Sequence, residues 1–138
     1  MLLDFAKIPA TRRPNACLAC PPHWNRSDGD PVSPVFKAPV ERLREVLVRI
    51  AAQELRTHLL CLDVQSRQAE FEQRSRILRF PDTTTVAFEP MGGNRSSLAI
   101  FSRARYGYWD FAVNRRRVER WLKALGESLG PTDNAFAP

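Results

Sequence analysis

Two segments of the chain place apolar side chains at the spacing of an α-helix. In residues 39–54, Val40, Leu43, Leu47, Ile50 and Ala51 recur at this spacing, and Pro39 suits the first helical position. In residues 114–129, Val118, Trp121, Leu122, Leu125 and Leu129 lie on one stripe. The pattern predicts two amphipathic helices, each with one buried face.

The residues between these helices show strand patterns instead. Residues 56–64 are largely apolar, and in residues 68–75 Ala69 and Phe71 alternate with Glu70 and Glu72. Residues 83–89 are rich in β-branched and aromatic side chains, residues 90–94 (PMGGN) indicate a turn, and residues 95–105 indicate a further strand. We expect the first two strands to form a hairpin.

This order of elements favours an α+β fold, because no helix separates one strand from the next. We expect an antiparallel sheet of at least four strands with the two helices packed on one face. The side chains predicted to form the core are Leu43, Leu47, Ile50, Leu60, Leu62, Phe71, Val86, Phe88, Leu98, Ile100, Val118, Trp121, Leu122 and Leu125.

The length of 138 residues suits one domain. Residues 1–39 hold seven of the eleven prolines, which predicts an extended, proline-rich N-terminal arm over residues 1–38. The α+β core is expected over residues 39–130 and a frayed tail over residues 131–138.

Most of the excess positive charge of the chain lies in one segment. The net charge is +6, and residues 103–123 hold seven basic residues against two acidic ones. No apolar run approaches the roughly 18 residues of a transmembrane helix, and the N-terminal residues do not resemble a secretory signal. The cytoplasm is therefore the default expectation for the compartment.

Three cysteines are too few for a disulfide scaffold. Cys17 and Cys20 form a C-x-x-C pair with His23 nearby, but a structural zinc ion needs four ligands, so these residues are only weak metal candidates. Ser75, Ser102 and Cys17 have no histidine at an informative spacing for nucleophilic catalysis. We expect no cofactor and no catalytic residue.

Three consecutive arginines open the second predicted helix. With Asn114 as N-cap, Arg115, Arg116 and Arg117 fill the first turn, where each cation costs about 0.3 to 1 kcal/mol. Carboxylates such as Asp110 can neutralise them, the helix can begin earlier, or an anion can bind where guanidinium and free N–H groups converge.

Three motifs resemble one known family. They are PNACLACPP at residues 14–22, the pattern R-S-R followed by F-P-D at residues 74–82, and SRARYGYWDFAVNRRRV at residues 102–118. Together they resemble the bacterial and plant family called domain of unknown function 1499, over about residues 4–129. The resemblance implies a shared polar cluster, and many relatives look membrane-tethered or exported. The implied cluster is Arg74, Arg76, Asp82, Ser102, Arg103, Arg105, Gly107, Asp110, Asn114, Arg115 and Arg117. This chain has Ala112 where many relatives carry glycine, and a single Asp82 where some carry two acidic residues.

Two interpretations of this cluster stay open. It can be a structural latch that joins the sheet to the second helix, or a site for a carboxylate or phosphate group. We expect Arg103 or Arg105 to pair with Asp82 or Asp110, and Arg116 to lie in solvent.

The preferred functional hypothesis is a non-catalytic binding domain. It would hold a small apolar or anionic ligand in a concavity between sheet and helices, with arginines at the mouth. The alternative is a single-stranded nucleic-acid-binding module that uses the basic and aromatic segment 103–123, including Tyr106, Tyr108 and Trp109.

Overall fold

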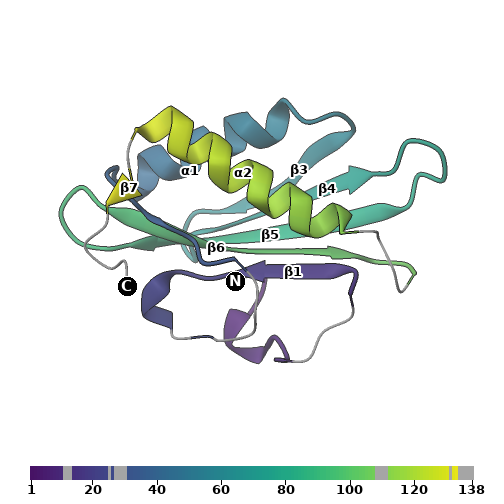
Figure 1. The fold of residues 1–138 in the computed structure, drawn as a ribbon, viewed down its shortest axis with the longest axis horizontal. Coiled ribbons are helices and arrows are strands. Elements are labelled where there is room, and N and C mark those ends of the chain that lie inside the picture. Colours follow the sequence, from purple (N-terminus) through teal and green to yellow (C-terminus); the bar gives the residue numbers. More distant parts are fainter. Residues whose placement is uncertain (11–13, 25, 27–30, 108–111, 131, 134–138) are drawn as a thin grey trace.

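The computed structural model describes the chain except for residues 11–13, 25, 27–30, 108–111, 131 and 134–138. Helices α1 (Val40–Ala52) and α2 (Val113–Leu129) lie together on one face of an antiparallel sheet (Figure 1). Short 3₁₀ helices η1 (Phe5–Lys7) and η2 (Pro22–Trp24) lie in the N-terminal segment. The α+β fold class is confirmed.

Seven strands of the described chain form the sheet, in the order β3-β4-β5-β6-β2-β7, and β1 also pairs with β6. Their bounds are β1 Ala16–Ala19, β2 Val35–Phe36, β3 Thr57–Asp63, β4 Gln68–Arg74, β5 Pro81–Pro90, β6 Ser96–Ala104 and β7 Thr132–Asp133. The predicted β3–β4 hairpin and the two later strands are present at nearly the expected positions. Strands β1 and β2 were not expected, because they are only four and two residues long and lie among prolines.

The second helix begins one residue earlier than predicted. Its N-cap is Ala112, with φ of 62°, and Val113 is already helical. Asn114 is therefore not the cap. Its side chain is completely buried and takes part in contacts inside the domain.

The main core fills the space between the helices and the sheet. Leu43 and Leu47 of α1 and Leu125 of α2 are fully buried there, and Trp121 packs edge-to-face on Phe71 of β4 with ring centroids 5.5 Å apart. Most of the predicted core residues are buried, which confirms the strand alternation assumed for β4, β5 and β6.

Leu60 and Leu62 contradict the predicted core, since they are 53% and 40% exposed. Strand β3 lies at the edge of the sheet, and its register with β4 shifts between Leu59 and Cys61. This β-bulge interrupts the alternation that the prediction assumed. An edge strand also has neighbours on only one side, so its apolar side chains receive less cover.

The N-terminal segment covers the face of the sheet that points away from the helices (Figure 1). A second apolar cluster forms there, with Phe5 and Ile8 of the arm packed near Leu18 of β1 and Ala99 of β6. The arm is thus partly irregular, as expected, but it also contributes β1 and β2 to the sheet. Among the described residues, no helix combines the length and the hydropathy needed to cross a bilayer.

Candidate functional site

The polar cluster that the sequence indicates is divided between the two faces of the sheet. Successive residues of a strand point to opposite faces. Ser102, Asp82 and Gln73 point to the helix side, whereas Arg103 and Glu72 point to the other side. The cluster therefore forms two groups with different surroundings.

On the helix side, Arg117 of α2 is the centre of a buried hydrogen-bond network. Its guanidinium group is 2% exposed and donates to the Ser102 hydroxyl at 3.0 Å and to the Asp82 carboxylate at 3.1 Å. It also donates to the side-chain oxygens of Gln73 and Asn114. One cation of the helix is thus surrounded by acceptors from β4, β5 and β6.

Asn114 extends this network to the N-terminal arm. It accepts a hydrogen bond from the Ser102 hydroxyl at 2.6 Å and donates to the backbone oxygen of Asn15 at 3.0 Å. Thr84 and Ser102 share a further hydrogen bond at 2.8 Å. The arrangement connects helix, sheet and arm, and it favours the latch interpretation over an anion site for Arg117, because both terminal nitrogens of the guanidinium group donate to protein acceptors.

On the opposite face, arginines surround Glu72. Its two carboxylate oxygens accept from Arg74 at 3.0 Å and from Arg105 at 3.3 Å. The Arg103 guanidinium group lies 4.8 Å from the centre of the Phe101 ring and donates to the Thr85 hydroxyl at 2.9 Å. Burial lowers the pKa of Arg103, as does the nearby Arg105, while Glu70 opposes the shift.

The structure bears on only part of the expectation that Arg103 or Arg105 pairs with Asp82 or Asp110. The ion pair that the structure describes for Asp82 is with Arg117, and Arg105 pairs with Glu72. Asp110 lies outside the described residues, so a pair with that residue stays a prediction. Arg115 pairs with Glu119 at 2.8 Å, and Arg116 is exposed, as is Arg76.

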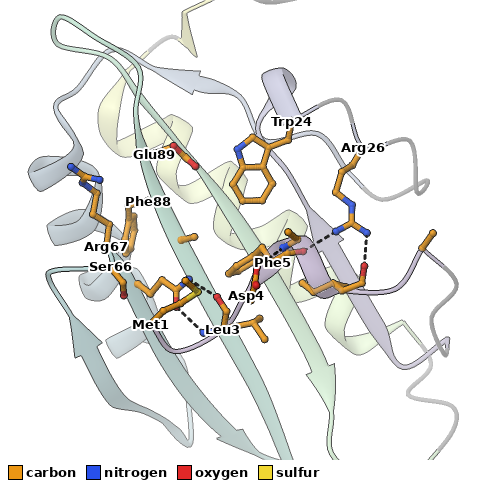
Figure 2. A pocket seen from close by; sticks show the side chains of 15 residues that line it. Met1, Leu3, Asp4, Phe5, Trp24, Arg26, Ser66, Arg67, Phe88 and Glu89 are labelled. Atoms are coloured by element: carbon orange, nitrogen blue, oxygen red, sulfur yellow. Dashed lines mark hydrogen bonds between the residues drawn. The ribbon is translucent and has the colours of Figure 1, made fainter.

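A cavity of about 800 Å³ lies on the face of the sheet away from the helices, between the arm and strand β5. We call it the arm groove. Phe5 and Trp24 form one side, Arg67 lies on the other, and Glu89 stands between them (Figure 2). The side chain of Phe88, next to Glu89, is buried in the core on the helix side. The groove combines apolar side chains with a few charged ones, as small-molecule sites do.

The wall that the arm forms is held by specific contacts. The side-chain oxygen of Gln68 accepts from the backbone N–H groups of Leu2 and Leu3 at 2.7 and 2.8 Å, and its amide donates to the Leu3 carbonyl at 2.7 Å. Arg26 donates to the carbonyls of Phe5 and Ile8 at 3.1 and 3.0 Å (Figure 2). These contacts fix the position of this wall on the sheet.

The groove was not foreseen from the sequence. Its lining comes from the arm, the turn between β3 and β4, and the end of β5, which are far apart along the chain. The buried Gln68 marks the groove in the folded structure, but nothing in the sequence distinguishes this glutamine from an exposed one.

The weak metal candidates do not lie together. Cys17 belongs to the core on the helix side, and Cys20 belongs to the cluster under the arm. His23 is exposed and contacts the edge of Trp24, with ring centroids 6.4 Å apart. No group of three metal-binding side chains occurs in the part of the chain that the structure describes.

A family model described as "Protein of unknown function (DUF1499)" matches residues 15–125. The chain belongs to this family. The DUF1499 match includes the residues of the Arg117 network. It begins after η1, so the part of the groove wall that residues 1–10 form lies outside the match. No curated protein matches the chain.

Among solved structures, the chain is similar to the crystal structure of the di-domain ARO/CYC BexL from the BE-7585A biosynthetic pathway. The identity is 16% and the TM-score 0.49, and the match covers 69% of this chain and 44% of the other. The chain thus spans less than half the length of that protein.

Proposed function

We propose that this domain is a non-catalytic binding domain, and that its site is the arm groove. The ligand class is a small, largely apolar molecule with an anionic group. The observation that carries the proposal is the cavity of about 800 Å³ with its apolar sides and arginine at the rim. Pockets for small molecules generally have volumes of about 300 to 1,000 Å³.

Apolar and aromatic side chains suit the body of such a molecule. Phe5 and Trp24 pack edge-to-face with ring centroids 5.9 Å apart, and Ala87 leaves room where a larger side chain would fill the groove. Burial of apolar ligand surface against these groups contributes roughly 25 cal/mol per Å².

The charged residues suggest where the polar end would lie. Arg67 is exposed beside Phe88, and within the described part of the chain no carboxylate pairs with its side chain (Figure 2). A guanidinium group binds a carboxylate or phosphate through two parallel hydrogen bonds. An arginine at the rim of the groove supports a site for an anionic group. The sequence hypothesis differs in two respects, because it names other arginines and expects the concavity between the sheet and the helices.

The competing hypothesis, a single-stranded nucleic-acid-binding module, has weaker support. Of the arginines in residues 103–123, Arg117 is buried, Arg103 lies half-buried on Phe101, and Arg115 and Arg120 each face a glutamate. Few guanidinium groups of this segment are thus left for a phosphate backbone.

We keep the cytoplasm as the expected compartment.

Native mass spectrometry of freshly purified protein tests the proposal directly, because a bound molecule adds its mass to that of the chain. Titration with anilinonaphthalene sulfonate, an apolar anion, provides a defined probe. We expect Ala87→Phe to weaken binding of this probe at least about tenfold, which corresponds to about 1.4 kcal/mol. Arg67→Ala should weaken binding about two- to fivefold, because the arginine is exposed.

Two matched controls separate the groove from general effects. Ala52→Phe adds the same side chain at an exposed position of α1, and Lys123→Ala removes an exposed cation of α2. Both should leave probe binding unchanged. The proposal is wrong if no molecule co-purifies and Ala87→Phe binds the probe as well as the parent protein. Oligonucleotide binding that falls steeply between roughly 50 and 200 mM salt would favour the competing hypothesis.

A further inference from the structure

The hairpin between β4 and β5 displays large apolar side chains at its tip. Ile77 is 84% exposed and Leu78 is 67% exposed. Phe80 and Tyr106 lie beside the tip, 50% and 60% exposed, with ring centroids 5.9 Å apart. Contiguous exposed apolar groups of this kind usually mark an interaction surface.

Hydrogen bonds hold this tip in a defined shape. Ser75 and Phe80 pair through Ser75 N–H and the Phe80 carbonyl at 3.0 Å, and the Ser75 hydroxyl accepts from the Phe80 N–H at 3.0 Å. The Arg74 guanidinium group donates to the Arg79 carbonyl at 2.9 Å. The turn therefore presents Ile77 and Leu78 outward from an ordered base.

Arginines surround the apolar tip. Arg74, Arg76 and Arg79 belong to the hairpin, and Arg105 lies beside it at the end of β6, while residues 73–81 contain no acidic residue. Glu72 pairs with Arg74 and Arg105. Among the described residues, no carboxylate pairs with Arg76 or Arg79. We call these four arginines, with Ile77, Leu78, Phe80 and Tyr106, the hairpin-end patch.

We propose that the hairpin-end patch docks the domain on the surface of an anionic lipid bilayer. Ile77 and Leu78 enter the boundary between headgroups and acyl chains, and Arg76 and Arg79 contact lipid phosphates. Apolar insertion and attraction of cations to anionic lipid together account for peripheral binding of this kind. We favour a bilayer over nucleic acid because the most exposed side chains of the patch, Ile77 and Leu78, are aliphatic, whereas nucleic-acid bases stack on aromatic rings.

The patch and the arm groove lie at different ends of the sheet. The hairpin follows Arg74 and precedes Pro81, whereas the groove involves Gln68 and Glu89 at the other ends of the same strands. In Figure 1 the hairpin extends from one end of the molecule, together with the turn after α1. A domain docked through the patch would keep its groove open, and the two proposals can fail independently.

Co-sedimentation with phosphatidylcholine vesicles, with and without phosphatidylglycerol, tests the proposal. The parent protein should bind the anionic vesicles and should bind neutral ones much more weakly. Replacing both Ile77 and Leu78 by serine should weaken binding at least about tenfold, because two apolar side chains no longer insert. Arg76→Gln and Arg79→Gln should each cost about fivefold, the effect of one cation near the surface.

Two variants serve as matched controls. Val64→Ser removes an exposed apolar side chain just after β3, at the end of that strand that lies away from the hairpin-end patch. Lys37→Gln removes an exposed cation next to β2. Neither should change vesicle binding. All altered side chains are exposed, so the thermal midpoints should stay close to that of the parent, which distinguishes lost docking from lost folding.

An added tryptophan gives a second readout. In Leu78→Trp the indole emission should shift to shorter wavelength on addition of anionic vesicles, because the ring enters an apolar layer. Equal vesicle binding by the Ile77 and Leu78 double variant and the parent would overturn the proposal. So would binding of a single-stranded oligonucleotide through the same arginines without any binding to vesicles.

Discussion

Removal of the Asp82 carboxylate tests whether the Arg117 network is a structural latch. In Asp82→Ala the Arg117 guanidinium group loses its ionic partner at 3.1 Å while it remains 2% exposed. Breaking a buried ion pair on one side generally costs about 3 to 5 kcal/mol. Asp82 is itself 18% exposed and Arg117 keeps its neutral acceptors, so we expect the lower value, about 3 kcal/mol.

Chemical and thermal denaturation followed by circular dichroism measure this loss. For a domain of this size, about 3 kcal/mol lowers the thermal midpoint by about 10 °C. The control is Glu119→Ala, because the Arg115–Glu119 pair is exposed by 48% and 52%. Removing an exposed pair of this spacing should cost less than about 0.5 kcal/mol.

A double-mutant cycle isolates the interaction itself. Asp82→Ala combined with Arg117→Met should give a coupling energy of about 2 kcal/mol, within the range for residues in one hydrogen-bond network. A coupling below about 0.5 kcal/mol would contradict the latch, as would equal losses in Asp82→Ala and Glu119→Ala. The reasoning from burial would then be wrong for this site.

Three further predictions follow from backbone and burial. Ala112 has φ of 62°, a left-handed conformation that glycine adopts without strain, so Ala112→Gly should raise the unfolding free energy by up to about 1 kcal/mol. Ala124→Gly inside α2 should lower the unfolding free energy by about 1 kcal/mol, because glycine is a poor helix former. A loss of stability in both variants would contradict the strain at position 112. Leu60→Ala should cost less than about 0.5 kcal/mol and Leu47→Ala about 2 to 5 kcal/mol in urea denaturation, because Leu60 is 53% exposed and Leu47 is fully buried; similar losses would mean that β3 is covered in solution. A thiol reagent should modify the exposed Cys61 rapidly in the folded protein, whereas Cys17 and Cys20 should react only on unfolding. Rapid modification of Cys20 would show that the cluster under the arm opens easily, and rapid modification of Cys17 would show the same of the core on the helix side.

The sequence alone determined the elements whose periodicity is strong. Leu43, Leu47, Trp121 and Leu125 repeat at helical spacing, and Ala69 and Phe71 alternate with acidic residues, because each element buries one face. The motifs at residues 74–82 and 102–118 were sufficient to indicate the DUF1499 family. Local pattern thus predicted the helices, four of the strands and the α+β class.

Only the tertiary structure decided which polar groups meet. Asp82 and Arg117 are 35 residues apart, and they pair because α2 packs over β6, the strand next to β5, so that the Arg117 side chain reaches the start of β5. Strand alternation then separates Ser102 from its neighbour Arg103, so one sequence cluster becomes two groups on opposite faces.

The edge of the sheet and the arm groove were also beyond local pattern. Leu60 and Leu62 look like core residues in the sequence, but their burial depends on a neighbouring strand and a covering helix, and β3 has a β-bulge at an edge. The groove exists because Gln68 and Arg26 hold the arm across the sheet through backbone carbonyl and N–H groups. Every residue has a backbone carbonyl group and every residue except proline has an N–H group, so contacts of this kind leave no recognisable pattern in the sequence.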